Sequence, residues 1–185
     1  VQSLKRPQMN AFFKLDIHPN MLHIKNCTFL KKRQYPHLRK VTFTEIKWKH
    51  ILAFLGSNLD IDTLEIDASL ENEAYQDLPF PLLKHLKHLT LARMDWEHLL
   101  FILKQCPKLE TLKIQACLNL TKSPIHPCVH LHTLQIHGPH WAQLKTLWPS
   151  SPALKSLTIE GEMDLDFKKE LELFPHLEKL SFKSM

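Results

Sequence analysis

The stretch Leu109-Glu-Thr-Leu112-Lys-Ile114 decides the fold of this chain, because its apolar pattern occurs seven times. Every copy has apolar residues at its first, fourth and sixth positions. The copies begin at Leu38, Ile61, Leu86, Leu109, Leu131, Leu154 and Leu177, so that consecutive copies start 22 to 25 residues apart. A fixed period of this size is typical of repeat proteins, whose similar units stack into a solenoid.

Each copy is predicted to contain a short strand. Side chains alternate between the two faces of a strand, so Leu112 and Ile114 should face the core. Thr111, Lys113 and Gln115 should then face away from it. No unit of this size buries its apolar face alone, and stacked neighbours share one continuous core.

The connections between the strands are predicted to contain helices and turns. Residues 96–105 carry apolar side chains at helical spacing. Proline ends a helix and keeps the preceding residue extended. Two residues before the first apolar residue of their copies stand Pro36, Pro107, Pro152 and Pro175. Tryptophan recurs seven residues after the central apolar residue, where we expect it to be a buried wedge at the start of a helix, at Trp48, Trp96 and Trp141.

The repeats are predicted to fill most of the chain. A degenerate copy at Leu22-His-Ile24 precedes the seven regular ones. Residues 21–185 are therefore interpreted as one repeat domain of about eight units. Residues 1–20 are interpreted as a lead-in or capping segment.

This period and pattern resemble the leucine-rich-repeat family. The resemblance implies an α/β solenoid with parallel strands on the concave face and helices and turns on the convex face. The stretch from Cys106 to Thr121, with Cys117 after the strand, resembles the cysteine-containing subclass of the family. That subclass is common in F-box proteins, the substrate-recognition subunits of ubiquitin ligases.

Composition narrows the function classes. The net charge is +5, and it is distributed unevenly, with eleven Lys and Arg against three acids in residues 1–60 and five against nine in residues 61–110. Such a gradient indicates a surface with its positive and negative charges separated, and not a uniformly basic surface. The chain has no apolar run of about 18 residues, so no membrane segment is predicted.

The four cysteines are predicted to be reduced and buried. They are Cys27, Cys106, Cys117 and Cys128, and none forms a Cys-x-x-Cys pair. Cys106 and Cys128 each precede the first Leu of a copy by three residues. Reduced thiols favour a cytoplasmic or nuclear location, which would be the host cytoplasm for a pathogen effector.

No catalytic residue, cofactor or small-molecule substrate is predicted, and we expect the chain not to be an enzyme. The sequence has no nucleophile elbow, no His-Glu-x-x-His pair and no phosphate-binding glycine loop, with only three glycines in total. Histidines crowd residues 126–140, but ligands spread along a strand do not converge tetrahedrally on zinc. No metal site is therefore predicted.

The strand residues whose side chains face away from the core are the predicted binding residues on the concave face. They are polar, rich in hydroxyl groups and mixed in charge, with an acidic spot at Glu65 and Asp67. The set comprises His23, Lys25, Thr42, Glu65, Asp67, His88, Thr90, Lys113, Gln115, Gln135, His137, Thr158, Glu160 and Lys183. Such a face favours a mostly polar protein partner.

A second surface is a basic patch near the N-terminal end, formed by Lys31, Lys32, Arg33, Arg39 and Lys40. Such a patch either contacts phosphate groups or is a solvated loop.

Three functions follow as hypotheses. The first is a protein-interaction scaffold, with the resemblance implying the substrate-recognition module of an F-box-type ubiquitin-ligase subunit. The second is a pathogen effector that uses the same repeat to bind host proteins. The third is nucleic-acid binding through the basic patch, which would weaken steeply as salt rises.

Overall fold

The computed structural model describes residues 3–4, 20–26, 34–67, 80–115, 128–137, 151–161 and 175–183. Within these ranges the elements, in chain order, are β1 (Ser3–Leu4), β2 (Met21–Lys25), β3 (Lys40–Thr44), α2 (Trp48–Leu55), β4 (Thr63–Asp67), β5 (His88–Ala92), α3 (Trp96–Lys104), β6 (Thr111–Gln115), β7 (Thr133–His137), β8 (Ser156–Glu160) and β9 (Lys179–Lys183). Neither of the two helices is long and apolar enough to cross a membrane.

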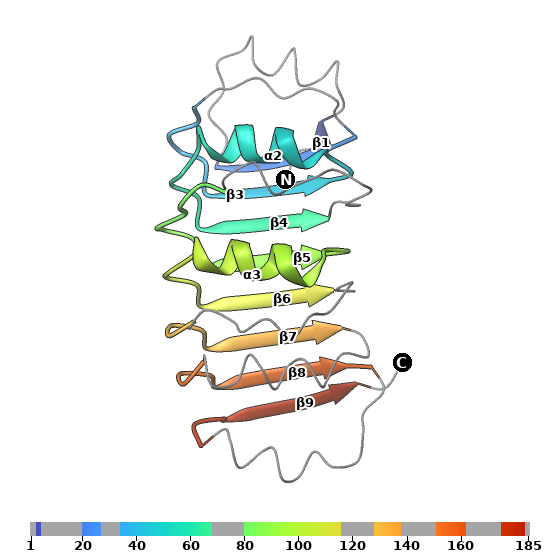
Figure 1. Ribbon diagram of the computed structural model, residues 1–185, viewed down its shortest axis with the longest axis vertical. Coiled ribbons are helices and arrows are strands. Elements are labelled where there is room, and N and C mark those ends of the chain that lie inside the picture. The colour runs from blue at the N-terminus through green and yellow to red at the C-terminus, as the bar shows by residue number, and fades with distance from the viewer. Residues whose placement is uncertain are drawn as a thin grey trace.

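All of these strands belong to one parallel sheet whose order follows the chain from β1 to β9 (Figure 1). The register is the same at every step from β2 onward, so that Leu64 pairs with Leu89 and Leu89 with Leu112. The predicted strands are confirmed. The degenerate copy also forms a strand of the sheet, since Leu22 pairs with Val41. The architecture is α/β with a single parallel sheet and few helices, which is compatible with a solenoid-like repeat.

The core lies on the side of the sheet that carries the helices. In β6 the buried and half-buried residues alternate, with Leu112 and Ile114 buried. Helices α2 and α3 lie on that same side (Figure 1). Each begins with a buried tryptophan, Trp48 or Trp96. The predicted wedge is confirmed for these two, while Trp141 lies outside the described residues.

A repeated turn delivers the chain into most of the strands. In it the backbone N–H of the first Leu of a copy donates to the carbonyl three residues earlier, as Leu109 does to Cys106. The donating residues with such a bond are Leu38, Leu86, Leu109, Leu131 and Leu154. Pro36, Pro107, Pro152 and Pro175 lie in turns at this place. Proline suits the second position of a β-turn because its φ is already set.

The residue immediately before each strand links neighbouring repeats. Its carbonyl accepts two backbone N–H groups from the next repeat, as Lys87 O does from Glu110 and Thr111. We call these residues the pre-strand column. It begins with the uncharged Asn20, and from β3 onward its members alternate in charge almost throughout, in the order Arg39, Asp62, Lys87, Glu110, His132, Lys155 and Glu178. Two ion pairs follow from this order, Lys87 with Glu110 and Lys155 with Glu178.

Candidate binding surface

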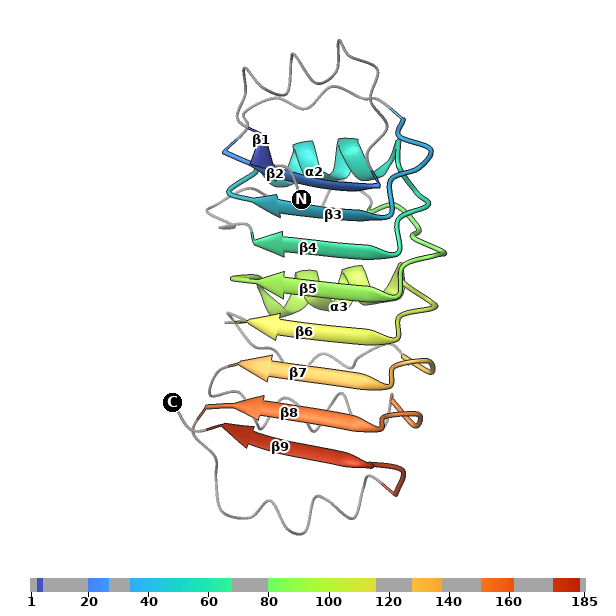
Figure 2. The ribbon, with the colours of Figure 1, turned by 180° about the vertical axis from the view of Figure 1, so that it is seen from behind.

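The side chains that point away from the core form the open face, which we define as the first, third and fifth residues of strands β2 to β9. Seen from behind, no described element crosses in front of β3 to β8 (Figure 2). All of the residues predicted for the concave face lie on the open face, in three ladders whose register is that of the strand pairing. Most of them are half-buried, because parallel strands are only about 4.8 Å apart and neighbouring side chains shield each other.

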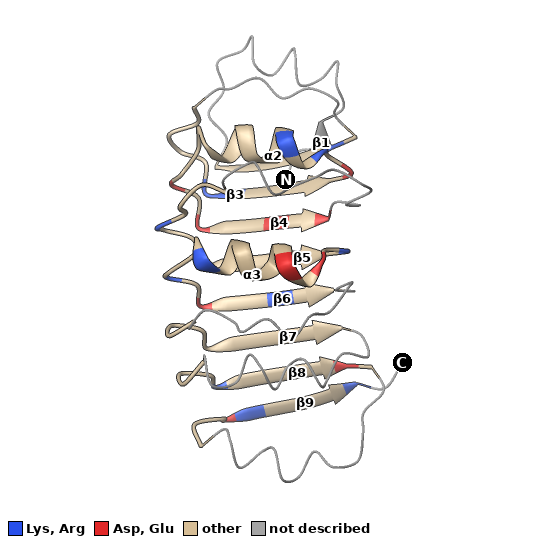
Figure 3. Ribbon diagram, in the orientation of Figure 1, with Lys and Arg blue, Asp and Glu red and all other residues tan. Residues whose placement is uncertain are grey.

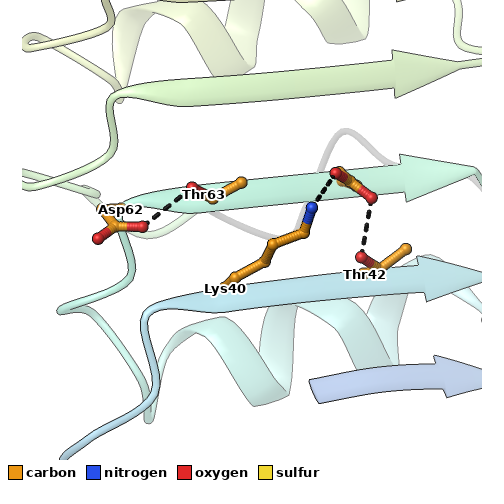
Figure 4. Close-up of polar contacts among 5 residues, drawn as sticks. Lys40, Thr42, Asp62 and Thr63 are labelled. Carbon is orange, nitrogen blue, oxygen red and sulfur yellow. Dashed lines mark hydrogen bonds and ion pairs between the residues drawn. The ribbon is translucent and has the colours of Figure 1, made fainter. Parts of the chain in front are cut away.

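One cluster on the open face surrounds the carboxylate of Glu65 on β4. Lys40 Nζ lies 2.5 Å from Glu65 Oε1, and Thr42 Oγ1 donates to Glu65 Oε2 at 2.9 Å. Figure 4 shows Lys40 and Thr42 reaching from β3 to the same carboxylate. Burial raises the pKa of Glu65, but the hydrogen bonds from Lys40 and Thr42 and the charge of Lys40 outweigh it, so this pKa lies below its ordinary value.

The second predicted acid of this region, Asp67, is also paired. Arg93 lies one residue beyond β5, and its Nε donates to Asp67 Oδ1 at 2.8 Å. Its Nη2 lies 2.7 Å from the same oxygen. The two carboxylates of the predicted acidic spot are thus both engaged in ion pairs. Both carboxylates are neutralised by a cation from a neighbouring repeat, because parallel in-register strands bring such side chains within reach.

A matching cluster lies at the other end of the face, around Glu160 on β8. His137 Nδ1 lies 2.7 Å from Glu160 Oε2, and Lys183 Nζ lies 2.7 Å from Glu160 Oε1. The hydrogen bond from Lys183 holds the pKa of Glu160 below its usual value, and the nearby charges of His137, Lys183 and Lys113 lower it further. Figure 3 shows this alternation of acidic and basic positions at the ends of β8 and β9.

The centre of the face differs from both ends. Lys113 on β6 is half-buried, and its partners in register are Thr90 on β5 and Gln135 on β7. Strands β5, β6 and β7 contain no Asp or Glu. Among the described residues Lys113 forms no ion pair.

The predicted basic patch is divided by the structure. Lys40 points onto the open face, where it pairs with Glu65. Arg39 belongs to the pre-strand column, and its guanidinium donates to the backbone carbonyl of Asp60 at 3.0 Å. The other three members, Lys31, Lys32 and Arg33, lie outside the described residues. The two described members therefore do not present a joint free cationic surface.

The predicted buried thiols are confirmed for Cys106 and Cys128, which are free and occupy equivalent positions in consecutive turns. Burial raises the pKa of both, that of Cys128 to about 11. Cys27 and Cys117 lie outside the described residues. In the described part of the chain, no three His, Cys, Asp or Glu side chains gather as metal ligands would.

Sequence reasoning missed the role of Arg93 and the pairing of Lys40. The signal for Lys40 was present, since it lies in the same ladder as Thr63, one step diagonally from Glu65. Arg93 lies outside the strand pattern, one residue after β5, with a φ of 56°. A period of two says nothing about the residue that follows the strand.

Comparison with known proteins gives no family for this chain. No family model matches the sequence, and no match was found among curated proteins or among solved structures. The function is therefore argued from the surface itself.

Proposed function

We propose that this chain is a leucine-rich-repeat domain that binds another protein through the open face and does not catalyse a reaction. One observation carries the proposal. Eight strands in uniform register present polar side chains on a face over which no described element passes (Figure 2). The leucine-rich-repeat assignment is supported by the seven copies of the apolar pattern and by the turn that precedes most strands.

The size of the face fits a macromolecule. With a strand spacing of about 4.8 Å and a rise of about 3.3 Å per residue, strands β2 to β9 cover roughly 34 Å by 16 Å. The resulting area of roughly 540 Å² is about two thirds of the roughly 800 Å² that each partner contributes to a standard protein interface. A small-molecule site would instead be a concave pocket lined mainly by apolar side chains.

The chemistry of the face favours protein over nucleic acid. Nucleic-acid affinity depends on cations that are free to replace counterions around phosphates. In the basic patch to which this binding was assigned, Lys40 is paired with Glu65 and Arg39 donates to the carbonyl of Asp60. The nucleic-acid hypothesis therefore depends on Lys31, Lys32 and Arg33. Replacing these three by Glu, and measuring oligonucleotide binding against salt, tests that alternative.

A narrower form of the proposal makes this domain the substrate-recognition module of an F-box-type ubiquitin ligase in the cytoplasm or nucleus. Its support is the resemblance of the stretch around Cys106 and the free, buried thiols of Cys106 and Cys128. Copurification of the full-length protein with other ubiquitin-ligase subunits tests it. If the full-length protein instead copurifies only with proteins of a host cell, the effector form of the proposal is favoured.

The open face is tested by enlarging two of its small side chains. The double variant Thr90→Trp/Thr158→Trp adds two bulky uncharged side chains to the face. The matched control is Phe101→Trp/Val129→Trp, which places the same side chains at exposed positions off the face. Affinity purification with quantitative mass spectrometry should recover the same partners with the wild type and the control. Those partners should be lost with the double variant, and their retention would show that the open face is not the binding site.

A further inference from the structure

The lysines of the open face fall into two groups. Lys40 and Lys183 each pair with a glutamate of a neighbouring strand. No described residue forms an ion pair with the other three, which are Lys25, Lys113 and Lys179. Lys25 and Lys179 are exposed near the two ends of the sheet, whereas Lys113 is half-buried at its centre.

The surroundings of Lys113 contain hydrogen-bonding groups without a carboxylate. Thr90 and Gln135 flank it in register, and the diagonal positions on β7 are Thr133 and His137. The ammonium group of Lys113 offers three hydrogen-bond donors and no acceptor. The hydroxyl of Thr90 and the amide of Gln135 offer further donors beside it. A half-buried cation with no Asp or Glu on the adjoining strands is suited to an anionic group of a partner.

We propose that the centre of the open face, formed by Thr90, Lys113 and Gln135, receives one or two carboxylates of an extended acidic segment of a protein. This inference rests on the proposed function and names the chemistry of the partner at that site. Lys113 would pair with a carboxylate oxygen while the neighbouring hydroxyl and amide groups bind the other oxygen.

The flanking clusters limit the length of the acidic segment. Glu65 and Asp67 lie on β4, and Glu160 lies on β8. A partner carrying acids beyond β5 to β7 would meet these carboxylates with their cations already paired, Lys40 with Glu65 and Lys183 with Glu160, and would gain no free cation there. The acidic stretch should therefore span about three strands, or roughly 10 Å between the outer two.

The same limits disfavour a nucleic acid at this place. A phosphate backbone would continue past β7 toward Glu160 and past β5 toward Glu65. Single-stranded nucleic acids also require aromatic side chains on which bases stack. None of the open-face residues of β5, β6 and β7 is Phe, Tyr or Trp.

Selection from a library of random dodecapeptides tests the inference. Peptides selected on the wild-type chain should be enriched in short clusters of Asp and Glu. A representative peptide should bind Lys113→Glu roughly tenfold or more weakly, as loss of a close charge pair predicts. The control is Lys104→Glu, which makes the same charge change at an exposed position of α3 on the other side of the sheet. It should leave both the enrichment and the affinity unchanged.

Lys113→Met removes the charge but keeps an unbranched side chain, so this variant should fold like the wild type. Circular dichroism checks the folding. Weaker binding by the folded variant is then due to the lost charge. Loss of acidic enrichment with both variants at Lys113 supports the inference. Acidic enrichment that survives them, or an oligothymidine that displaces the peptide more effectively than a soluble acidic competitor, overturns it. Peptides whose binding requires Thr90 and Thr158 but which are not enriched in Asp and Glu overturn this inference and leave the proposed function standing. Peptides that bind Thr90→Trp/Thr158→Trp as well as wild type contradict the proposed function too.

Discussion

The side-chain oxygen of Asn58 accepts a hydrogen bond from the backbone N–H of Tyr35 at 2.7 Å, across one repeat of the chain. Asn58 is 5% exposed, and its amide nitrogen also donates to Phe54 O at 2.9 Å. Asn58→Leu would leave the buried N–H of Tyr35 without that acceptor, at a cost of about 1–3 kcal/mol. Urea unfolding should show a lower midpoint. Ser57→Ala, which removes only a 3.4 Å hydrogen bond of a half-buried hydroxyl, should have a much smaller effect.

Backbone strain beside the strands predicts a stabilising substitution. Glu45 follows β3 with a φ of 55° and is exposed. A left-handed conformation costs a residue other than glycine roughly 1 kcal/mol. Glu45→Gly should therefore raise the melting temperature, as thermal unfolding would measure. Glu45→Ala removes the same side chain without relieving the strain, so an equal gain from this variant would contradict the explanation.

The cluster around Glu65 predicts a loss of stability in acid. The pKa of Glu65 in the folded chain lies below its ordinary value of 4.5, so the unfolded chain binds more protons at this site as the pH falls. Its stabilising contribution is present above about pH 4.5 and is lost as the pH falls through the lowered pKa. Glu65→Gln should flatten the dependence of the urea midpoint on pH in this range. Glu45→Gln, which removes an exposed carboxylate outside the cluster, is the control.

The alternating charges of the pre-strand column should contribute to stacking. Lys155 Nζ lies 2.8 Å from Glu178 Oε1, and both side chains are exposed. Lys155→Glu would replace attraction by repulsion and should destabilise the fold by about 0.2–1 kcal/mol, the range of exposed pairs. The swap Lys155→Glu/Glu178→Lys should restore most of the loss. A double variant as unstable as the single one would show that the pair contributes nothing.

The two buried thiols should resist alkylation in the folded protein. Burial raises the pKa of Cys128 to about 11, and Cys106 is buried beside it. The thiolate is the reactive species, so only a small fraction of either residue is reactive near pH 8. Iodoacetamide labelling followed by peptide mass spectrometry should show slow modification of both residues in buffer and fast modification in urea. Fast labelling of Cys106 in the folded chain would contradict its burial.

The strands and their register could be read from the sequence. Leu64, Leu89 and Leu112 align in the repeated pattern and pair in the sheet. Side chains alternate with a period of two, so a slip by one residue would move every buried Leu and Ile to the open face. Because that slip would cost a large free energy, the apolar pattern of the sequence determines the register of the strands. The helix expected over residues 96–105 was found over Trp96–Lys104 for a similar reason, because its apolar spacing matches one buried face.

The sequence by itself thus determined which residues face the core and which form the open face, because burial of apolar surface follows a fixed period. Only the tertiary structure decided how the charges of that face are shared. Glu65 and Asp67 look alike along the chain, yet one pairs with Lys40 of the preceding repeat and the other with Arg93 of the following one. Such pairing depends on the distances that separate long side chains across neighbouring strands, which a linear pattern does not contain. The same geometry leaves Lys113 at the centre of the open face with no Asp or Glu on the adjoining strands.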